Sequence, residues 1–357
     1  MSGPLEADPE LGGKEPTPPA NGRRSESLKP AQKDHQEDSD KKLQWGFRLS
    51  WAGNWILLAA KLYAFVASRS KSVLASLADS AVDLVSQLVI SMAELFMKRA
   101  KSEKYPVGRA RLEALGVIGC ACIMSIASIE VIQFSGTDLY NGFAKGELPE
   151  LDVGVVMYAI LGAGVGLKIL LFLYCRTYKN RSDSMGALAE DHLNDVVSNA
   201  GAIITATIAS KVPGAWFVDP LGAIVISLWI ISRWIGLTYV QVKKIVGGSA
   251  PDEFKGKVKS LADEHHDALE VDSLKAYHFG SRFNVEVEVI LPADMTVAES
   301  HDIAVDLQHK IEAMEDVERA FVHVDYKSRD VPEHKVERQM HKQKKKPRAL
   351  VRRRTFL

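Results

Sequence analysis

Two pairs of aspartates with the same spacing, Asp79/Asp83 and Asp191/Asp195, lie in segments that are otherwise typical of membrane-spanning helices. Residues four apart share one face of an α-helix and lie about 6 Å apart along its axis. An ionised carboxylate inside a bilayer costs about 2.5 kcal/mol or more on insertion scales. A bound cation would offset these charges, so we predict that the four aspartates bind a metal ion.

Each pair is extended by an amide one helical turn further on. Gln87 follows Asp83, and Asn199 follows Asp195, by four residues each. Two helices that cross at these faces would present carboxylate and amide oxygens to one volume. Oxygen-only sites suit Mg²⁺, Ca²⁺ or Mn²⁺, whereas zinc sites generally recruit His or Cys. The pattern therefore predicts a site for a hard divalent cation.

Two more polar residues are candidates for the lining of this site. Asn54, in the first apolar segment, could reach it, although an interhelical hydrogen bond explains this residue equally well. His192 directly follows Asp191, and successive helical residues diverge by about 100°. We therefore expect His192 to line the site rather than to bind the metal.

The other intramembrane charges have simpler explanations. We expect Glu130 and Lys168 to form a structural ion pair, and Lys61 to extend its amine toward the membrane interface. Asp219 precedes a proline at the start of the last apolar segment, which is typical of a helix N-cap. Asp191 could also be an N-cap, which is the alternative explanation for that residue.

Six segments are long enough to cross a hydrocarbon core of about 30 Å as helices. They are residues 46–67, 73–97, 112–134, 152–175, 187–210 and 216–239. The mean hydropathy of −0.05 conceals them because it averages an apolar middle with very polar ends. We predict a six-helix transmembrane domain over residues 46–240.

The flanking segments differ in composition. Residues 1–45 carry sixteen charged residues and few apolar ones, which predicts a disordered tail. Residues 245–330 show a helix, two strands, a helix and a strand, which predicts a small α+β domain. Residues 331–357 form a basic tail that is expected to be disordered, either solvated or in contact with anionic lipid. Three cysteines, all in or beside apolar segments, give no disulfide framework.

The short loops indicate the orientation. Residues 98–111 contain six Lys or Arg, and further basic residues follow the fourth and sixth apolar segments. The opposite loops carry fewer. Lys and Arg accumulate in cytoplasmic loops, so both termini are expected to be cytoplasmic.

Five stretches of this sequence resemble the cation diffusion facilitator family, in its manganese-type branch. They are residues 76–86 (SLADSAVDLVS), 104–113 (KYPVGRARLE), 190–199 (EDHLNDVVSN), 275–280 (KAYHFG) and 317–325 (VERAFVHVD). The resemblance covers about residues 45–330. It implies a six-helix transporter with a cytoplasmic metallochaperone-like domain, which works as a homodimer and exchanges metal for protons.

The same resemblance bears on the metal. Zinc-type members carry His at the position that matches Asp191, so Asp here implies Mn²⁺ as substrate, with Zn²⁺, Fe²⁺ or Co²⁺ as alternatives. The resemblance as a whole implies H⁺ as the counter-ion. No permanent cofactor and no nucleic acid partner are implied. His301, His323 and Asp325 match cytoplasmic ligand positions of zinc-type relatives, but we expect folding and dimer roles for them. The implied location is an acidic endomembrane, such as a vacuole or the Golgi, rather than the plasma membrane.

Two other functions compete with transport. Intramembrane aspartyl proteases also use two membrane aspartates, but they need one on each of two helices and commonly a GxGD motif, which this sequence lacks. A transport-silent partner subunit is the other alternative. Intact aspartates at all four positions argue against it.

Overall fold

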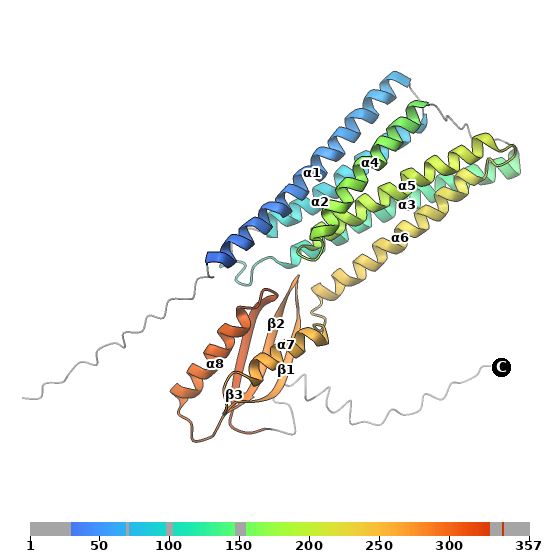
Figure 1. Cartoon of the computed structure of the whole chain (residues 1–357). Coiled ribbons are helices and arrows are strands. Elements are labelled where there is room, and N and C mark those ends of the chain that lie inside the picture. The colour runs from blue at the N-terminus through green and yellow to red at the C-terminus, as the bar shows by residue number, and fades with distance from the viewer. Residues whose placement is uncertain (1–29, 69–70, 98–102, 147–154, 329–337, 339–357) are drawn as a thin grey trace, which may run out of the picture. The chain divides into compact units, whose positions relative to one another are not determined.

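A computed structural model describes residues 30–68, 71–97, 103–146, 155–328 and 338 of the 357-residue chain. Six long helices precede a small domain of helices and strands (Figure 1). The long helices are α1 (Pro30–Ser68), α2 (Lys71–Met97), α3 (Arg111–Lys145), α4 (Val155–Tyr178), α5 (Asp183–Lys211) and α6 (Val218–Ile245). The basic tail predicted over residues 331–357 lies outside the described residues, except for residue 338.

Five stretches within these helices are long and apolar enough to cross a membrane, counted over the described residues. They are Lys41–Val66, Ser76–Met97, Arg111–Lys145, Tyr158–Tyr178 and Val218–Ile245. Helix α5 has 29 residues and is therefore about 43 Å long, enough to cross, but acidic residues crowd its first half. The helical membrane fold is confirmed, and α5 as the sixth span stays a prediction.

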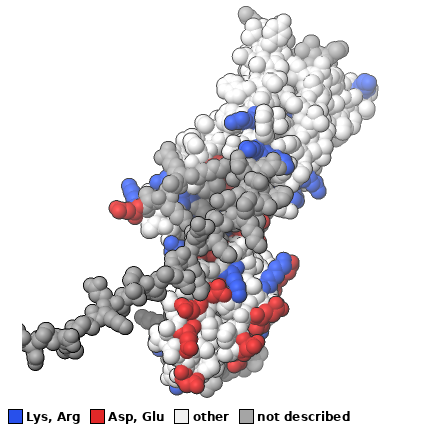
Figure 2. All heavy atoms as spheres, turned by 60° about the vertical axis from the view of Figure 1, so that its left-hand side comes forward, with Lys and Arg blue, Asp and Glu red and all other residues white. Residues whose placement is uncertain are grey.

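The outer surface of the long helices is apolar. Large side chains such as Ile56, Leu170 and Ile235 are more than 60% exposed, as expected where the solvent is lipid. On the face shown in Figure 2, uncharged residues cover most of the helical part, whereas acidic side chains gather on the C-terminal domain. The surface itself thus separates a membrane part from an aqueous part.

Helix boundaries differ from the sequence expectation at the N-terminus. We expected disorder up to residue 45, whereas α1 already begins at Pro30. Proline is compatible with the first turn of a helix, and no glycine or further proline occurs between residues 31 and 45. Residues 1–29 lie outside the described part of the chain.

The C-terminal domain has the predicted order of elements. It consists of α7 (Asp252–Asp263), β1 (Glu270–Phe279), β2 (Arg282–Ile290), α8 (Val297–Glu312) and β3 (Val317–Asp325). Strands β1 and β2 are antiparallel and β3 runs parallel to β2, in the order β1-β2-β3. Gly280 takes a φ of 68° in the β1–β2 turn, where residues other than glycine are strained.

Alternation along β2 builds the core of this domain. Val285, Val287 and Val289 are buried, and the residues between them are partly exposed. Leu307 and Ile311 of α8 are fully buried in the same cluster. Every buried member of the cluster lies between residues 250 and 320, so the domain has a core of its own.

We therefore expect residues 245–330 to fold as an isolated fragment. In that fragment, Leu307→Ala should lower the free energy of unfolding by about 2–5 kcal/mol, because it leaves a cavity in a close-packed core. Urea denaturation followed by circular dichroism measures the change. Val297→Ala is the matched control, since this side chain is 85% exposed and its truncation should change stability by no more than about 0.5 kcal/mol. Equal effects of the two substitutions would contradict the assigned core.

Candidate metal site

The N-terminus of α5 is fixed by side chains of neighbouring helices. Ser182 is the N-cap, with its oxygen accepting from Met185 N at 3.4 Å. Its hydroxyl donates to Glu113 Oε1 of α3 at 2.8 Å, and the Ser184 N–H donates to the same oxygen at 3.1 Å. Because the helix already begins at Asp183, Asp191 lies more than two turns inside it. Asp191 is therefore not an N-cap.

The expected cap at Asp219 is wrong. The N-cap position of α6 is Phe217, which makes no side-chain cap hydrogen bond. Asp219 lies in the first turn of α6 and accepts a hydrogen bond from Thr205 Oγ1 of α5 at 2.6 Å. The carboxylate thus links α5 to α6 instead of capping the N-terminus of α6.

Lys168 of α4 joins one aspartate from each pair. Its Nζ lies 3.3 Å from Asp83 Oδ2 of α2 and forms an ion pair with Asp195 Oδ2 of α5. The lysine side chain is only 2% exposed. The aspartate faces of α2 and α5 therefore meet, with an ammonium group between them.

Two expectations about intramembrane charges fail for the same reason. Glu130 is exposed on α3, so the expected Glu130–Lys168 pair is wrong, and Lys168 pairs with buried carboxylates instead. Lys61 does not extend to an interface. It is 6% exposed and donates to Ser76 O at 3.0 Å and to Ser80 Oγ at 2.7 Å. A buried ammonium group is stable only when it is paired with hydrogen-bond acceptors or carboxylates, and both lysines find such partners inside the protein.

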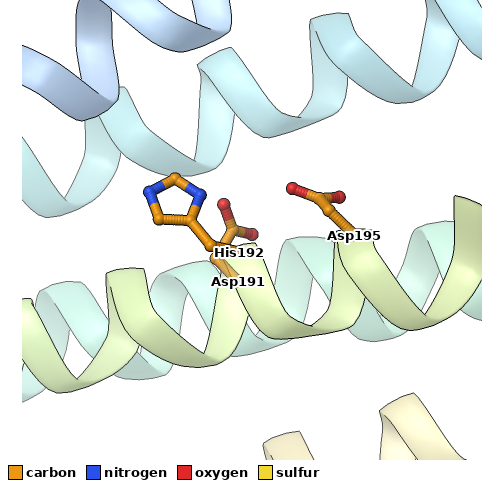
Figure 3. A group of neighbouring side chains, drawn as sticks. All are labelled: Asp191, His192 and Asp195. Atoms are coloured by element: carbon orange, nitrogen blue, oxygen red, sulfur yellow. The ribbon is translucent and has the colours of Figure 1, made fainter. Parts of the chain in front are cut away.

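Asp191 is a buried carboxylate whose oxygens find no hydrogen-bond partner among the described residues. It is 1% exposed, and both Oδ1 and Oδ2 are unpaired. Ligand atoms of Asp191, His192 and Asp195 lie within 4.8 Å of one another, and Figure 3 shows the three side chains on one side of α5. A buried charge without a partner is strongly unfavourable. A cation in this position would remove that cost.

His192 lies nearer to the aspartates than its position in the helix suggested. The ring is fully buried, and its Nε2 is 2.9 Å from Ser50 Oγ of α1. The other ring nitrogen, Nδ1, has no partner among the described residues. The ring lies on the side of α5 that carries Asp191 and Asp195. His192 could therefore provide a nitrogen ligand to a metal ion as well as line the site.

The amides expected near the site have different positions. Asn54 Nδ2 donates to Gln87 Oε1 at 2.8 Å, which is the interhelical hydrogen bond considered as the alternative. Asn54 Oδ1 and Gln87 Nε2 have no partner within the described chain. Asn199 is half-buried, one turn beyond Asp195. Asp79 is exposed, one turn before Asp83, and does not belong to the clustered group on α5.

Two residues of this region escaped the sequence reasoning. Lys168 was expected to pair with Glu130. A lysine in the middle of an apolar helix was nevertheless a signal that it pairs with buried carboxylates. Asn194 is 1% exposed, and neither polar atom of its side chain has a partner in the described residues. Its spacing of three from Asp191 was a usable signal, because residues three apart are neighbours on a helix.

No comparable cluster occurs in the C-terminal domain over its described residues. His301 and His323 are exposed. Across the part of the chain that the structure describes, the one group of three close His, Cys, Asp or Glu side chains is that on α5. The candidate ligand atoms among the described residues therefore lie in the helical part of the protein.

Comparison with known proteins agrees with this picture. Residues 48–246 match the cation efflux transmembrane domain, and residues 250–327 match the cytoplasmic domain of cation efflux proteins. Metal tolerance protein 10 of Arabidopsis thaliana is 38% identical over 307 residues, which are 84% of this chain and 70% of the relative. Metal tolerance protein 11 of the same plant is 35% identical over 303 residues, covering 85% and 76%.

A rice relative extends the comparison. Metal tolerance protein 5 of Oryza sativa subsp. japonica is 35% identical over 288 residues, 80% of this chain and 68% of the relative. The domain matches and the relatives confirm the family assignment made from the motifs. The chain therefore belongs to the cation diffusion facilitator family and is a divalent metal cation efflux transporter.

Proposed function

We propose that the protein is a Mn²⁺/H⁺ antiporter that exports Mn²⁺ from the cytosol, and that Asp79, Asp83, Asp191 and Asp195 bind the ion. The observation that carries the proposal is the buried Asp191 carboxylate with two unpaired oxygens beside Asp195. Three of the four carboxylates converge at one level of the helices. Asp79 is one turn away on α2, where it is exposed and available to an arriving cation.

The donor atoms favour a hard ion. Carboxylate oxygens predominate, and carboxylate sites suit Mn²⁺. His192 adds one imidazole nitrogen near the group, a ligand that also suits zinc and iron. Fe²⁺, Co²⁺ and Zn²⁺ are therefore the competing substrates, and they differ from Mn²⁺ in how much they would depend on His192.

Proton exchange follows from the burial of the carboxylates. When the metal leaves, negative charges remain in a site that excludes water, and protons can neutralise them. An acidic lumen supplies those protons and favours release on that side. We place both termini in the cytosol from the distribution of Lys and Arg in the loops, and the protein in an acidic endomembrane.

The proposed assembly is a homodimer in the lipid bilayer. The match of residues 250–327 to the cytoplasmic domain of cation efflux proteins suggests homodimerisation. We extend the proposal to the basic residues 331–357, whose ten Lys and Arg would attract anionic lipid at the cytoplasmic surface. The family consists of transporters, so the protease alternative has no support.

Neutralising either central aspartate should stop transport. We expect Asp83→Asn and Asp195→Asn to lower Mn²⁺-driven proton flux in proteoliposomes by at least about tenfold, since each removes a charged ligand from a buried site. Glu190→Gln is the control. That carboxylate immediately precedes Asp191 but binds Arg233, at 2.6 and 3.1 Å, and should keep most of the flux.

Undiminished flux in both aspartate variants would contradict the proposed site. The purified wild-type protein must also carry Mn²⁺ without another subunit. A folded protein that binds Mn²⁺ and yet moves none would instead support the transport-silent subunit.

The residue at position 191 should set the choice of metal. Asp191→His replaces a carboxylate with an imidazole, so we expect the ratio of Zn²⁺ to Mn²⁺ transport to rise by about tenfold. Uptake of Mn²⁺, Zn²⁺, Fe²⁺, Co²⁺ and Ca²⁺, measured side by side across one proton gradient, gives this ratio. Ser210→His, at an exposed position near the end of α5, provides the control for adding a histidine to the same helix. An unchanged ratio in Asp191→His would remove Asp191 from the set of ligands.

A further inference from the structure

Lys168 places its ammonium group between the two central aspartates. Its ammonium group contacts Asp83 Oδ2, at 3.3 Å, and Asp195 Oδ2. These oxygens belong to α2 and α5, whereas the lysine belongs to α4, so the contact joins three helices. The side chain is among the most deeply buried of the large residues in the described chain.

A divalent ion bound by both carboxylates would compete with this arrangement. Metal–oxygen bonds to hard cations are about 2.0–2.6 Å long, so an ion bound by both Asp83 and Asp195 would lie within a few ångströms of Lys168 Nζ. Lys168 Nζ already contacts one oxygen of each. Two cations within a few ångströms repel each other strongly where water is excluded. Binding of the ion by both aspartates therefore requires Lys168 to withdraw.

We propose that Lys168 is a tethered counter-cation that alternates with the transported metal at Asp83 and Asp195. The inference rests on the proposed function of these aspartates. In one stage the ammonium group pairs with both carboxylates, and in the other the metal displaces it. Lys168 is thus a positioning residue that lowers metal affinity and speeds release by returning to the carboxylates.

The neighbouring side chains fit such an exchange. Asp191 lies one turn from Asp195 and keeps both oxygens unpaired, so it offers the arriving ion a ligand that Lys168 does not occupy. A lysine side chain is a compact point charge on a flexible four-carbon stem, and its head can move without movement of the helix.

Lys61 provides a matched comparison. It is the other lysine buried within the described helices, and its Nζ donates to Ser76 O and Ser80 Oγ of α2. Lys61 therefore carries the same charge as Lys168, but its hydrogen-bond acceptors are uncharged. A general electrostatic effect would involve Lys61 as much as Lys168, whereas an exchange at the carboxylates involves Lys168 specifically.

The test measures Mn²⁺ affinity by isothermal titration calorimetry on the purified full-length protein in detergent at one fixed pH. Lys168→Met should bind Mn²⁺ at least about tenfold more tightly than the wild type, because it loses the competing charge. Its maximal transport rate in proteoliposomes should fall. Lys61→Met should change the affinity by less than about threefold, since it vacates no carboxylate.

Three outcomes separate the possible failures. Unchanged or weaker binding in Lys168→Met, together with loss of binding in Asp195→Asn, would overturn the role of Lys168 and leave the proposed function intact. Equal tightening in Lys168→Met and Lys61→Met would also overturn it, because the effect would then be one of general charge. Wild-type binding in both Asp83→Asn and Asp195→Asn would overturn the proposed function itself.

A second comparison covers a failure of Lys168→Met to fold. Asp83→Asn combined with Lys168→Met removes one charge of each sign. The double variant therefore leaves less uncompensated charge inside the protein than Lys168→Met alone. We expect the double variant to bind Mn²⁺ at least about tenfold more tightly than Asp83→Asn alone. It should also show a larger rise in the midpoint of thermal unfolding on addition of Mn²⁺. Equal affinity and equal thermal shift in the two variants would overturn the exchange.

Discussion

The membrane domain depends on neutralisation of buried carboxylates. Asp83, Asp191 and Asp195 are enclosed by helices whose outer surfaces are apolar. A negative charge without a partner is far less stable there than in water. Lys168 pairs with two of these carboxylates but carries only one positive charge, and Asp191 has no partner among the described residues. The three carboxylates therefore carry more negative charge than Lys168 can offset, and a divalent cation bound among them would offset the excess.

The helices are held so that this site forms. The N-terminus of α5 is attached to α3 through Glu113 and to α6 through the ion pair of Lys244 and Asp183, with distances of 2.6 and 2.7 Å. Further along, Asp219 of α6 binds Thr205 of α5. These contacts lie toward the two ends of α5, and the proposed metal ligands lie between them. Motion of α5 relative to α2 would therefore change the site without disturbing the polar contacts that tie α5 to α6.

Much of this arrangement could be predicted from the sequence. The i, i+4 spacing located the aspartates because helical periodicity is local, and the alternating valines of β2 located a strand for the same reason. The partner of Lys168 could not be predicted, since it depends on which helices meet. Glu130 lies on an apolar helix as Asp83 does, and the sequence did not show that its face of α3 is exposed. The position of Asp219 was missed because a local capping signal yielded to a tertiary hydrogen bond with Thr205.

The most direct test is to locate Mn²⁺ in the protein. An anomalous difference map, calculated from crystals grown with Mn²⁺ and measured at the manganese absorption edge, shows the ion independently of any variant. We predict a peak between Asp83, Asp191 and Asp195, with Lys168 moved away from the carboxylates of Asp83 and Asp195. A peak elsewhere in the chain, with Lys168 still between Asp83 and Asp195, would contradict it.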